Sequence, residues 1–270
     1  MQLSTPQISK NQFEHLARKV YGICGIELKA GKEQLVQSRL SKRLSALQLK
    51  SFDEYFDLLE REPNGKEVVL MIDSITTNKT SFFREVEHFN FLRSEVYPKF
   101  EGSSMRIWCA AASSGEEPYS IAIQLLEELP RIQSRDVKIL ATDISTKILA
   151  RAREGIYTTE SLQPISAAWR SKHFRATDQT ATTWQVRPET AAMVKLARLN
   201  LMEPWPMRGP FDIIFCRNVM IYFDKKTQER LVQRFYDLIK PGGYLLVGHS
   251  ESLTGAAHDF KYVQPATYRK

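Results

Sequence analysis

Residues 105–120 read MRIWCAAASSGEEPYS, and this stretch decides the fold. An apolar run with the composition of a buried strand passes through a turn of small residues, 110–115, into the start of a helix. Small side chains let a ligand approach the backbone of such a turn closely. A phosphate-binding loop would place a lysine or a bare helix amino terminus against its anion, but Glu116 and Glu117 occupy that position here. The turn therefore suits a neutral or cationic ligand.

A second apolar run, residues 137–142, ends at a carboxylate, Asp143. It follows the small-residue turn by about one strand and helix, where an acidic side chain can accept hydrogen bonds from both hydroxyls of a ribose. Taken alone, Asp143 would be a helix cap before Ile144 and Ser145. Combined with the preceding turn, it predicts a nucleoside site without a phosphate clamp.

Short apolar runs and helical patterns alternate outward from these motifs. We expect strands at residues 105–112, 137–142, 194–198, 211–216, 243–248 and near 260–263, and helices at residues 116–129, 145–153 and 225–239. This alternation predicts an α/β fold with a mostly parallel sheet and helices on both faces. Residues 155–193 interrupt it, and their polar stretch 176–183 suits a hairpin in a small inserted subdomain. Pro241, Gly242 and Gly243 predict a helix stop and a tight turn.

The first 75 residues have a different pattern. Helices are expected from residue 10 until Gly22 and Gly25 break the pattern, then at residues 32–47, 52–61 and 66–74, which predicts a small all-helical unit. Residues 1–50 hold nine Lys or Arg and three Asp or Glu, a net charge of +6. Such a basic element is either solvated surface or a docking site for an acidic partner. Its cationic face lies on the second helix and consists of Lys32, Arg39, Lys42 and Arg43.

The whole chain has 270 residues and a net charge of +7, and 43% of its residues are hydrophobic. This composition excludes disordered and collagen-like chains. Cys24, Cys109 and Cys216 lie too far apart for a disulfide framework or a zinc site, so we expect a reducing compartment and no metal. There is no signal core and no run of about 18 uncharged apolar residues, which predicts a soluble cytoplasmic protein.

Five motifs in a fixed order indicate a family: NKTSFFRE at residues 78–85, AASSGEEPYS at 111–120, ATDI at 141–144, Asn200-Leu201, and FCRNVMIYF at 215–223. The chain resembles the class I S-adenosylmethionine-dependent methyltransferases and, more narrowly, the chemotaxis receptor glutamate methyltransferases of the CheR family. The resemblance implies a Rossmann-like, seven-stranded, mostly parallel sheet. It also implies an N-terminal all-helical domain at residues 1–75, a methyltransferase domain at 76–270 and a small inserted β-subdomain at 155–193.

The resemblance implies S-adenosylmethionine as the cofactor and S-adenosylhomocysteine as its product. Asp143 would accept the ribose hydroxyls, Asn200 and Leu201 would border the adenine, and Asn218 and Val219 would lie near the methionine portion. A carboxylate suits the ammonium group of the donor, and either Glu117 or Glu116 could supply it. The full donor site implied by the resemblance is Asn78, Thr80, Arg84, Glu117, Asp143, Asn200, Leu201, Asn218 and Val219.

Family resemblance also implies that Arg84 and Tyr222 lie near the transferred methyl group and place the acceptor. A glutamate side chain has a pKa of about 4.3, so the nucleophile is already an anion at neutral pH and needs no general base. The enzyme must supply alignment and partial removal of water. Without the family, Arg84 would be interpreted as a surface ion pair and Tyr222 as a core aromatic.

In the resembling family, the acceptors are glutamates on the cytoplasmic helical bundle of chemoreceptors, which become methyl esters during sensory adaptation. The basic side chains Lys32, Arg39, Lys42 and Arg43 could steer such a bundle by long-range attraction. Relatives also grip a receptor's carboxyl-terminal peptide by strand addition to the inserted subdomain. The loop at residues 175–183 lacks the glycines of peptide-tethered members. Neither nucleic acid nor direct membrane insertion is implied.

Other functions fit the sequence less well. A nucleic-acid methyltransferase would agree with the pI of about 9.2, but no aromatic side chains interleave with basic ones as in an RNA-stacking surface. A non-catalytic donor-sensing module would not need Arg84 or Tyr222. Cys109 and Cys216 are expected to be buried, inert thiols. His249 near Ser250 and Glu251 does not by itself indicate a hydrolase triad.

Overall fold

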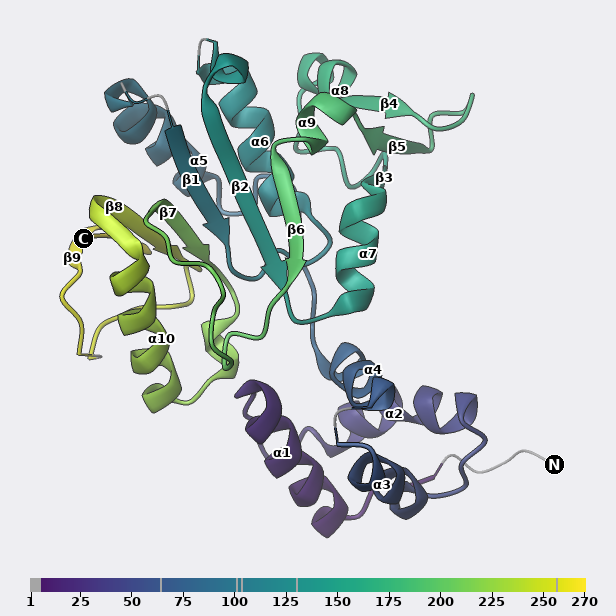
Figure 1. Ribbon diagram of the computed structural model, residues 1–270. Helices are drawn as coiled ribbons and strands as arrows, with labels where there is room; N and C mark the ends of the chain where they lie inside the picture. The colour runs from purple at the N-terminus through teal and green to yellow at the C-terminus, as the bar shows by residue number, and fades with distance from the viewer. Residues whose placement is uncertain (1–5, 64, 101, 103, 130, 256) are drawn as a thin grey trace.

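The computed structural model describes residues 6–63, 65–100, 102, 104–129, 131–255 and 257–270 (Figure 1). Its centre is a seven-stranded sheet in the order β6-β2-β1-β7-β8-β10-β9, in which β6, β2, β1, β7 and β8 are parallel. The strands are β1 Ser104–Cys109, β2 Asp136–Asp143, β6 Val194–Arg198, β7 Phe211–Cys216, β8 Ile239–Val247, β9 Lys261–Gln264 and β10 Thr267–Arg269. The predicted seven-stranded, mostly parallel sheet is confirmed.

Helices cover both faces of this sheet because its strands are apolar on both sides. Ile107 and Cys109 of β1 pack in one cluster with α6 and the α5–η1 segment, whereas Trp108 and Ala110 pack in a second cluster with α10. Such double burial is the usual condition of a parallel sheet. The covering elements are α5 Val86–Phe91, the π-helical turn η1 Leu92–Val96, η2 Tyr97–Lys99, α6 Glu116–Glu128, η3 Ile132–Ser134, α7 Thr146–Glu154, η4 Met220–Tyr222 and α10 Lys225–Leu238.

The amino-terminal helices form a layer with its own apolar core. They are α1 Lys10–Cys24, α2 Glu33–Ala46, α3 Phe52–Arg61 and α4 Lys66–Ile75. Ser9 and Gln12 form a capping box at the start of α1, and Gly25, with φ of 72°, ends it. The expected break at Gly22 is wrong: one helical glycine costs only about 1 kcal/mol, and the buried neighbours Val20 and Cys24 keep the last turn of α1 packed.

The inserted segment forms a second, antiparallel sheet in the order β3-β5-β4. Its elements are β3 Ile156–Thr158, α8 Ala167–His173, β4 Phe174–Ala176, β5 Thr183–Val186 and α9 Pro188–Ala191. The predicted hairpin is confirmed, since β4 and β5 pair on either side of the polar loop. Phe174 and Val186 pack on Tyr119 and Ile123 of α6, so this sheet shares a core with the central domain.

Several elements differ from the sequence prediction. The α5–η1 segment was not expected, although its residues Phe89, Phe91 and Leu92 are buried against the sheet. The strand β8 begins at Ile239, so Pro241 lies within it rather than in a preceding turn. Pro241 is tolerated there because the sheet register is irregular at this point. The final strand β10, which was not expected, inserts between β8 and β9.

The carboxyl ends of the parallel strands face the helical layer α1–α4 (Figure 1). Hydrogen bonds tie the two parts together at this edge, and three of them illustrate how. The Tyr21 hydroxyl lies 2.6 Å from Asp224 Oδ2, Glu27 N donates to the carbonyl of Tyr222 at 2.8 Å, and Asp73 Oδ2 accepts from Thr146 Oγ1 at 3.0 Å. The sheet edge and the helices therefore enclose a space between them.

Candidate functional site

A cavity of about 470 Å³ lies at the carboxyl edge of the sheet, between the sheet and the helical layer. This volume is in the range of small-molecule sites, about 300–1,000 Å³. The loops after β1, β2 and β7 form its floor, where the strand order reverses between β1 and β7, the usual ligand position in open α/β sheets. All the donor-site residues expected from the resemblance line it: Asn78, Thr80, Arg84, Glu117, Asp143, Asn200, Leu201, Asn218 and Val219.

The loop after β1 keeps its shape through one glycine and two hydrogen bonds. Gly115 has φ of 99°, and a Cβ atom there would lie 2.8 Å from the Tyr157 hydroxyl, so only glycine fits. The same hydroxyl donates to the carbonyl of Ser114 at 2.7 Å. Ser113 Oγ donates to the carbonyl of Asn78 at 2.9 Å. The loop is thereby fixed to the segment that links the two domains.

Asp143 ends β2 with its carboxylate directed at the neighbouring loop. Its Oδ2 accepts from Ser113 N at 2.9 Å, and its Oδ1 accepts from Ser145 N at 3.0 Å. The side chain of Ser145, not that of Asp143, caps α7. Burial raises the pKa of Asp143 above its ordinary value, although the two backbone hydrogen bonds oppose this. A carboxylate has about four acceptor positions, so each oxygen can still accept one hydroxyl.

Arg217, at the end of β7, holds two carboxylates from different segments. Its Nη1 lies 2.9 Å from Glu117 Oε2, and its Nη2 lies 3.0 Å from Glu85 Oε2 and donates to the carbonyl of Arg84. The Arg217 side chain is 2% exposed. Two carboxylates against one guanidinium leave an excess charge of −1 beside the cavity. This excess favours a cationic ligand.

The two carboxyl groups that bind Arg217 differ in how strongly they ionise. Burial raises the pKa of Glu117, and Arg217 offsets this only in part. Burial also opposes ionisation of Glu85, but Arg217, Asn218 and the backbone of His249 outweigh it and hold the pKa of Glu85 below its usual value. Glu116 forms a hydrogen bond of 2.6 Å with Ser114 Oγ and does not line the cavity. Of the two glutamates, only Glu117 is therefore in position to meet a ligand there.

Asn218 adopts a left-handed backbone conformation with φ of 57°. Glu251 stabilises it, because its Oε2 accepts from Asn218 N at 2.8 Å and from Gly248 N at 2.6 Å, and its Oε1 accepts from Ile221 N at 3.1 Å. Burial raises the pKa of Glu251. This buried carboxylate fixes the turn that presents Asn218 and Val219 to the cavity.

Asn200 connects the cavity wall to α1. Its Nδ2 donates to the carbonyl of Ile23 at 2.7 Å, and its Oδ1 accepts from Met202 N at 3.0 Å. The side chain is therefore engaged inside the protein. Asn200 and Leu201 can offer a planar ligand their backbone and the apolar side chain of Leu201, which is 7% exposed.

Arg84 and Tyr222 both line the cavity and are half-buried. Arg84 Nη1 donates to the carbonyl of Lys79 at 2.8 Å. This contact uses one of the five N–H donors of the guanidinium, so the others can bind an anion. Tyr222 is held through its backbone, whose carbonyl accepts from Glu27 N.

The four basic side chains predicted on the second helix have different environments, and the first of them, Lys32, is the N-cap before α2. Arg43 binds Glu67 through Nε at 3.0 Å and Nη2 at 2.6 Å, and Glu67 is 8% exposed. Arg39 donates to the carbonyls of Ile75 and Thr76. These contacts stabilise the helical layer from within. Lys32 and Lys42 are exposed, and both Lys32 and Arg39 line the cavity. Of the four basic residues predicted to face a partner, only Lys32 and Lys42 are therefore exposed.

Sequence reasoning missed the roles of Arg217, Glu85 and Glu251. All three belong to stretches that it singled out, FCRN, FFRE and GHSES, but it gave their charges no function. An arginine placed directly after an apolar strand was the available signal, because such a charge is buried only with a partner. The buried thiols of Cys109 and Cys216 agree with the prediction, and burial raises the pKa of each.

Residues 78–269 match the SAM-binding domain of CheR methyltransferases, and residues 11–76 match the all-alpha domain of CheR methyltransferases. A chemotaxis protein methyltransferase of Borreliella burgdorferi is 42% identical, over 97% of this chain and 95% of that protein. A chemotaxis protein methyltransferase of Pseudomonas aeruginosa is 43% identical, over 96% and 93%. That of Escherichia coli is 41% identical, over 92% and 86%. Among the described residues, no helix is long and apolar enough to cross a bilayer.

Replacing Arg217 by methionine should destabilise the protein by about 3–5 kcal/mol at neutral pH, because Glu117 and Glu85 would stay buried without their guanidinium. Losing Arg217 raises the pKa of both carboxyls in the folded state, so their protonation favours folding. The loss of stability relative to the wild type should therefore shrink as the pH falls from about 7.5 to about 5. Urea unfolding at both pH values measures this. The exposed Arg208→Met variant is the control. A loss of stability that grows on acidification would contradict the ion pairing of Arg217 with the two carboxylates.

Proposed function

Because the chain belongs to the CheR methyltransferase family, we propose that it transfers methyl groups from S-adenosylmethionine to glutamate side chains of chemoreceptors in the cytoplasm. The product on the receptor is a glutamyl methyl ester, and the second product is S-adenosylhomocysteine. The observation that carries this proposal is the composition of the cavity. Glu117 and Asp143 outnumber Arg217 on its floor, and Lys29, Lys32 and Arg39 outnumber Glu27 on its helical side. One space therefore suits a cationic donor and an anionic acceptor.

The residues of the cavity floor fit the donor. S-adenosylmethionine supplies an electrophilic methyl group on a sulfonium, together with an α-ammonium group and a ribose. Asp143 would accept the ribose hydroxyls through the acceptor positions that Ser113 and Ser145 leave free. Glu117 would accept from the ammonium group, supported by the excess negative charge around Arg217. Leu201 and Val219 would give the adenine and the methionine portion apolar contact.

The acceptor requires no general base, because a glutamate is ionised at neutral pH. Arg84 would hold one carboxylate oxygen through its remaining N–H donors and leave the other free to attack the methyl group. The hydroxyl of Tyr222 would orient the same carboxylate. The bound donor and the apolar walls would exclude water and strengthen these contacts.

The receptor would dock on the helical side of the cavity. Lys32, the N-cap of α2, and Lys42, within α2, are exposed and are not part of the internal contacts that engage Arg39 and Arg43. A carboxylate-bearing helical bundle would be steered by these charges. A receptor peptide that adds a strand to the inserted sheet would have to join β3 or β4, which are its edge strands.

Transfer of labelled methyl groups to a purified receptor cytoplasmic fragment tests this function. We expect label that mild alkali releases as methanol, which identifies a carboxyl ester. Base-stable label would place the acceptor on nitrogen or carbon and overturn the proposal. In the same assay, Arg84→Ala should lower turnover by at least about tenfold while it changes donor affinity much less, since Arg84 holds the acceptor. Full turnover in Arg84→Ala would rule out this role.

Asp143→Asn should weaken the binding of S-adenosylhomocysteine by about tenfold or more, because the amide accepts fewer hydrogen bonds than the carboxylate and lacks its charge. Calorimetric titration measures the affinity. The matched control is Asp136→Asn, at the opposite end of the same strand and exposed to solvent. Unchanged affinity in Asp143→Asn would exclude Asp143 from the donor site.

Charge reversal of both Lys32 and Lys42 to glutamate should reduce receptor methylation severalfold at low salt, because the steering field is lost, and should not weaken donor binding. The wild-type rate should fall with ionic strength, whereas the rate of the double variant should depend on it much less. Lys261→Glu, on the exposed edge strand β9, is the control. Equal rates for the double variant and this control would refute docking on α2.

A further inference from the structure

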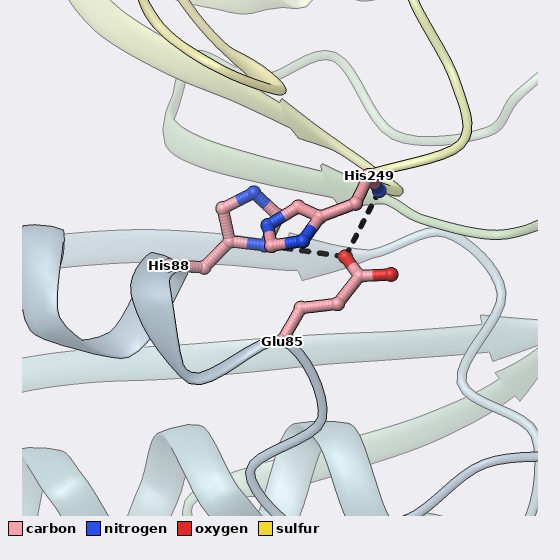
Figure 2. A group of neighbouring side chains, drawn as sticks. All are labelled: Glu85, His88 and His249. Atoms are coloured by element: carbon pink, nitrogen blue, oxygen red, sulfur yellow. Dashed lines mark hydrogen bonds and ion pairs between the residues drawn. The ribbon is translucent and has the colours of Figure 1, made fainter.

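A second group of ligand-bearing side chains lies beside the Arg217 network. Glu85, at the start of α5, His88, one turn further, and His249, after β8, direct one another's polar atoms into one small space (Figure 2). One ligand atom from each lies within 4.8 Å of the other two. His88 Nδ1 is 3.7 Å from Glu85 Oε2. Nothing in the proposed methyl transfer uses His88 or His249.

His88 is the unusual member of this group. Its side chain is completely buried, and neither ring nitrogen has a hydrogen-bond partner. A buried polar side chain without partners costs free energy and calls for an explanation. The Ala266 backbone lies beside the ring without forming a hydrogen bond of full geometry. A ligand at Nδ1 would leave the other nitrogen to donate to this backbone, the usual arrangement of a metal-bound histidine.

We propose that Glu85, His88 and His249 form a binding site for a divalent transition-metal cation such as Zn²⁺ or Co²⁺. Two imidazoles and one carboxylate are a common ligand set for these ions, which take a water molecule as the fourth ligand. The His249 side chain is 39% exposed and leaves this position open to solvent. The site is distinct from the methyl-transfer cavity, whose lining includes none of the three residues.

The hydrogen bonds of Glu85 leave room for a cation. Its carboxylate accepts from Arg217 Nη2, Asn218 Nδ2 and His249 N. Oε2, the oxygen nearest His88, accepts from Arg217 and His249, and Oε1 accepts only from Asn218. The remaining acceptor position is therefore on Oε1, and the carboxylate would have to turn to bind a metal ion. Glu87 adds a further carboxylate, since its Oε2 lies 3.9 Å from His249 Nε2.

Carboxylates outnumber the guanidinium in this region, although Arg217 lies near His88 and its positive charge has to be offset there. The carboxylates of Glu85 and Glu117 bind the single positive charge of Arg217 in this buried region, and a third carboxylate, Glu251, accepts from the backbone of the next residue, Asn218. When all three are ionised, the excess is −2. Arg217 keeps Glu117 and the carbonyl of Arg84 as partners if Glu85 turns toward a metal.

The geometry needs only a small adjustment. Ligand atoms about 2.1 Å from a tetrahedral ion lie about 3.4 Å apart, so the widest separation must close by up to about 1.4 Å. The exposed His249 ring can supply this movement by rotation about its side-chain bonds. The ion would then connect α5 to the loop after β8, two segments 164 positions apart in sequence.

Cobalt titration of the untagged, chelator-treated protein tests this site. We expect one Co²⁺ per chain, with visible d–d bands and no near-ultraviolet thiolate band, because no cysteine takes part. The ion should also raise the melting temperature, since it binds the folded state. His249→Ala and Glu85→Gln should each weaken cobalt binding by at least about tenfold. His15→Ala, which removes a half-buried histidine of α1, should bind as the wild type does.

The absence of visible bands in the wild type would overturn the proposal. It would also be overturned if both site variants bound cobalt as tightly as His15→Ala, because the metal would then be held elsewhere. Circular dichroism of each variant separates loss of the ligand from loss of the fold. If one variant does not fold, the other decides the question. Zn²⁺ that displaces the bound Co²⁺ with a stoichiometry of one would further support the assignment.

Discussion

The buried contact of Arg217 with Glu117 and Glu85 is the constraint on which the site depends. It connects the end of β7, the first turn of α6 and the segment that enters α5. A guanidinium at this depth is tolerated only because two carboxylates and a backbone carbonyl surround it. These contacts in turn fix the positions of Arg84 and Asn218, which adjoin Glu85 and Arg217 in sequence. The charge network therefore sets the geometry of the cavity floor.

The helical layer completes the cavity rather than simply covering it. The link between the domains forms a wall of the cavity beside the floor, where the carbonyl of Asn78 accepts from Ser113. Asn200 reaches back to the carbonyl of Ile23 at the end of α1. Because these contacts cross between the domains, a ligand in the cavity would touch both. Movement of one domain relative to the other would therefore change the ligand site.

The sequence predicted those parts that follow from local patterns. The strands 194–198 and 211–216 are apolar runs between turn residues, and the structure reproduces their bounds. The α5–η1 segment was missed because its apolar face is interrupted by charged residues, and only the sheet beneath it shows which side is buried. The charge partners were missed for a related reason: 100 positions separate Arg217 from Glu117, and no local pattern predicts such a pair. Likewise, Arg43 looked accessible until Glu67 appeared beside it.

The distribution of charge over the cavity explains how one space could serve two ligands of opposite sign. Glu117 and Asp143 lie on the floor, whereas Lys29 and Lys32, in the loop before α2, and Lys79 and Arg84, in the linker, form the basic wall. A cationic donor and an anionic acceptor would each be attracted to its own side, and their mutual attraction would favour close approach of methyl group and carboxylate. Transfer of the methyl group would remove the sulfonium charge from one ligand and the carboxylate charge from the other. Both products would then be attracted less strongly to the protein than the reactants were. The charges that line the cavity would therefore favour binding of the reactants and release of the products.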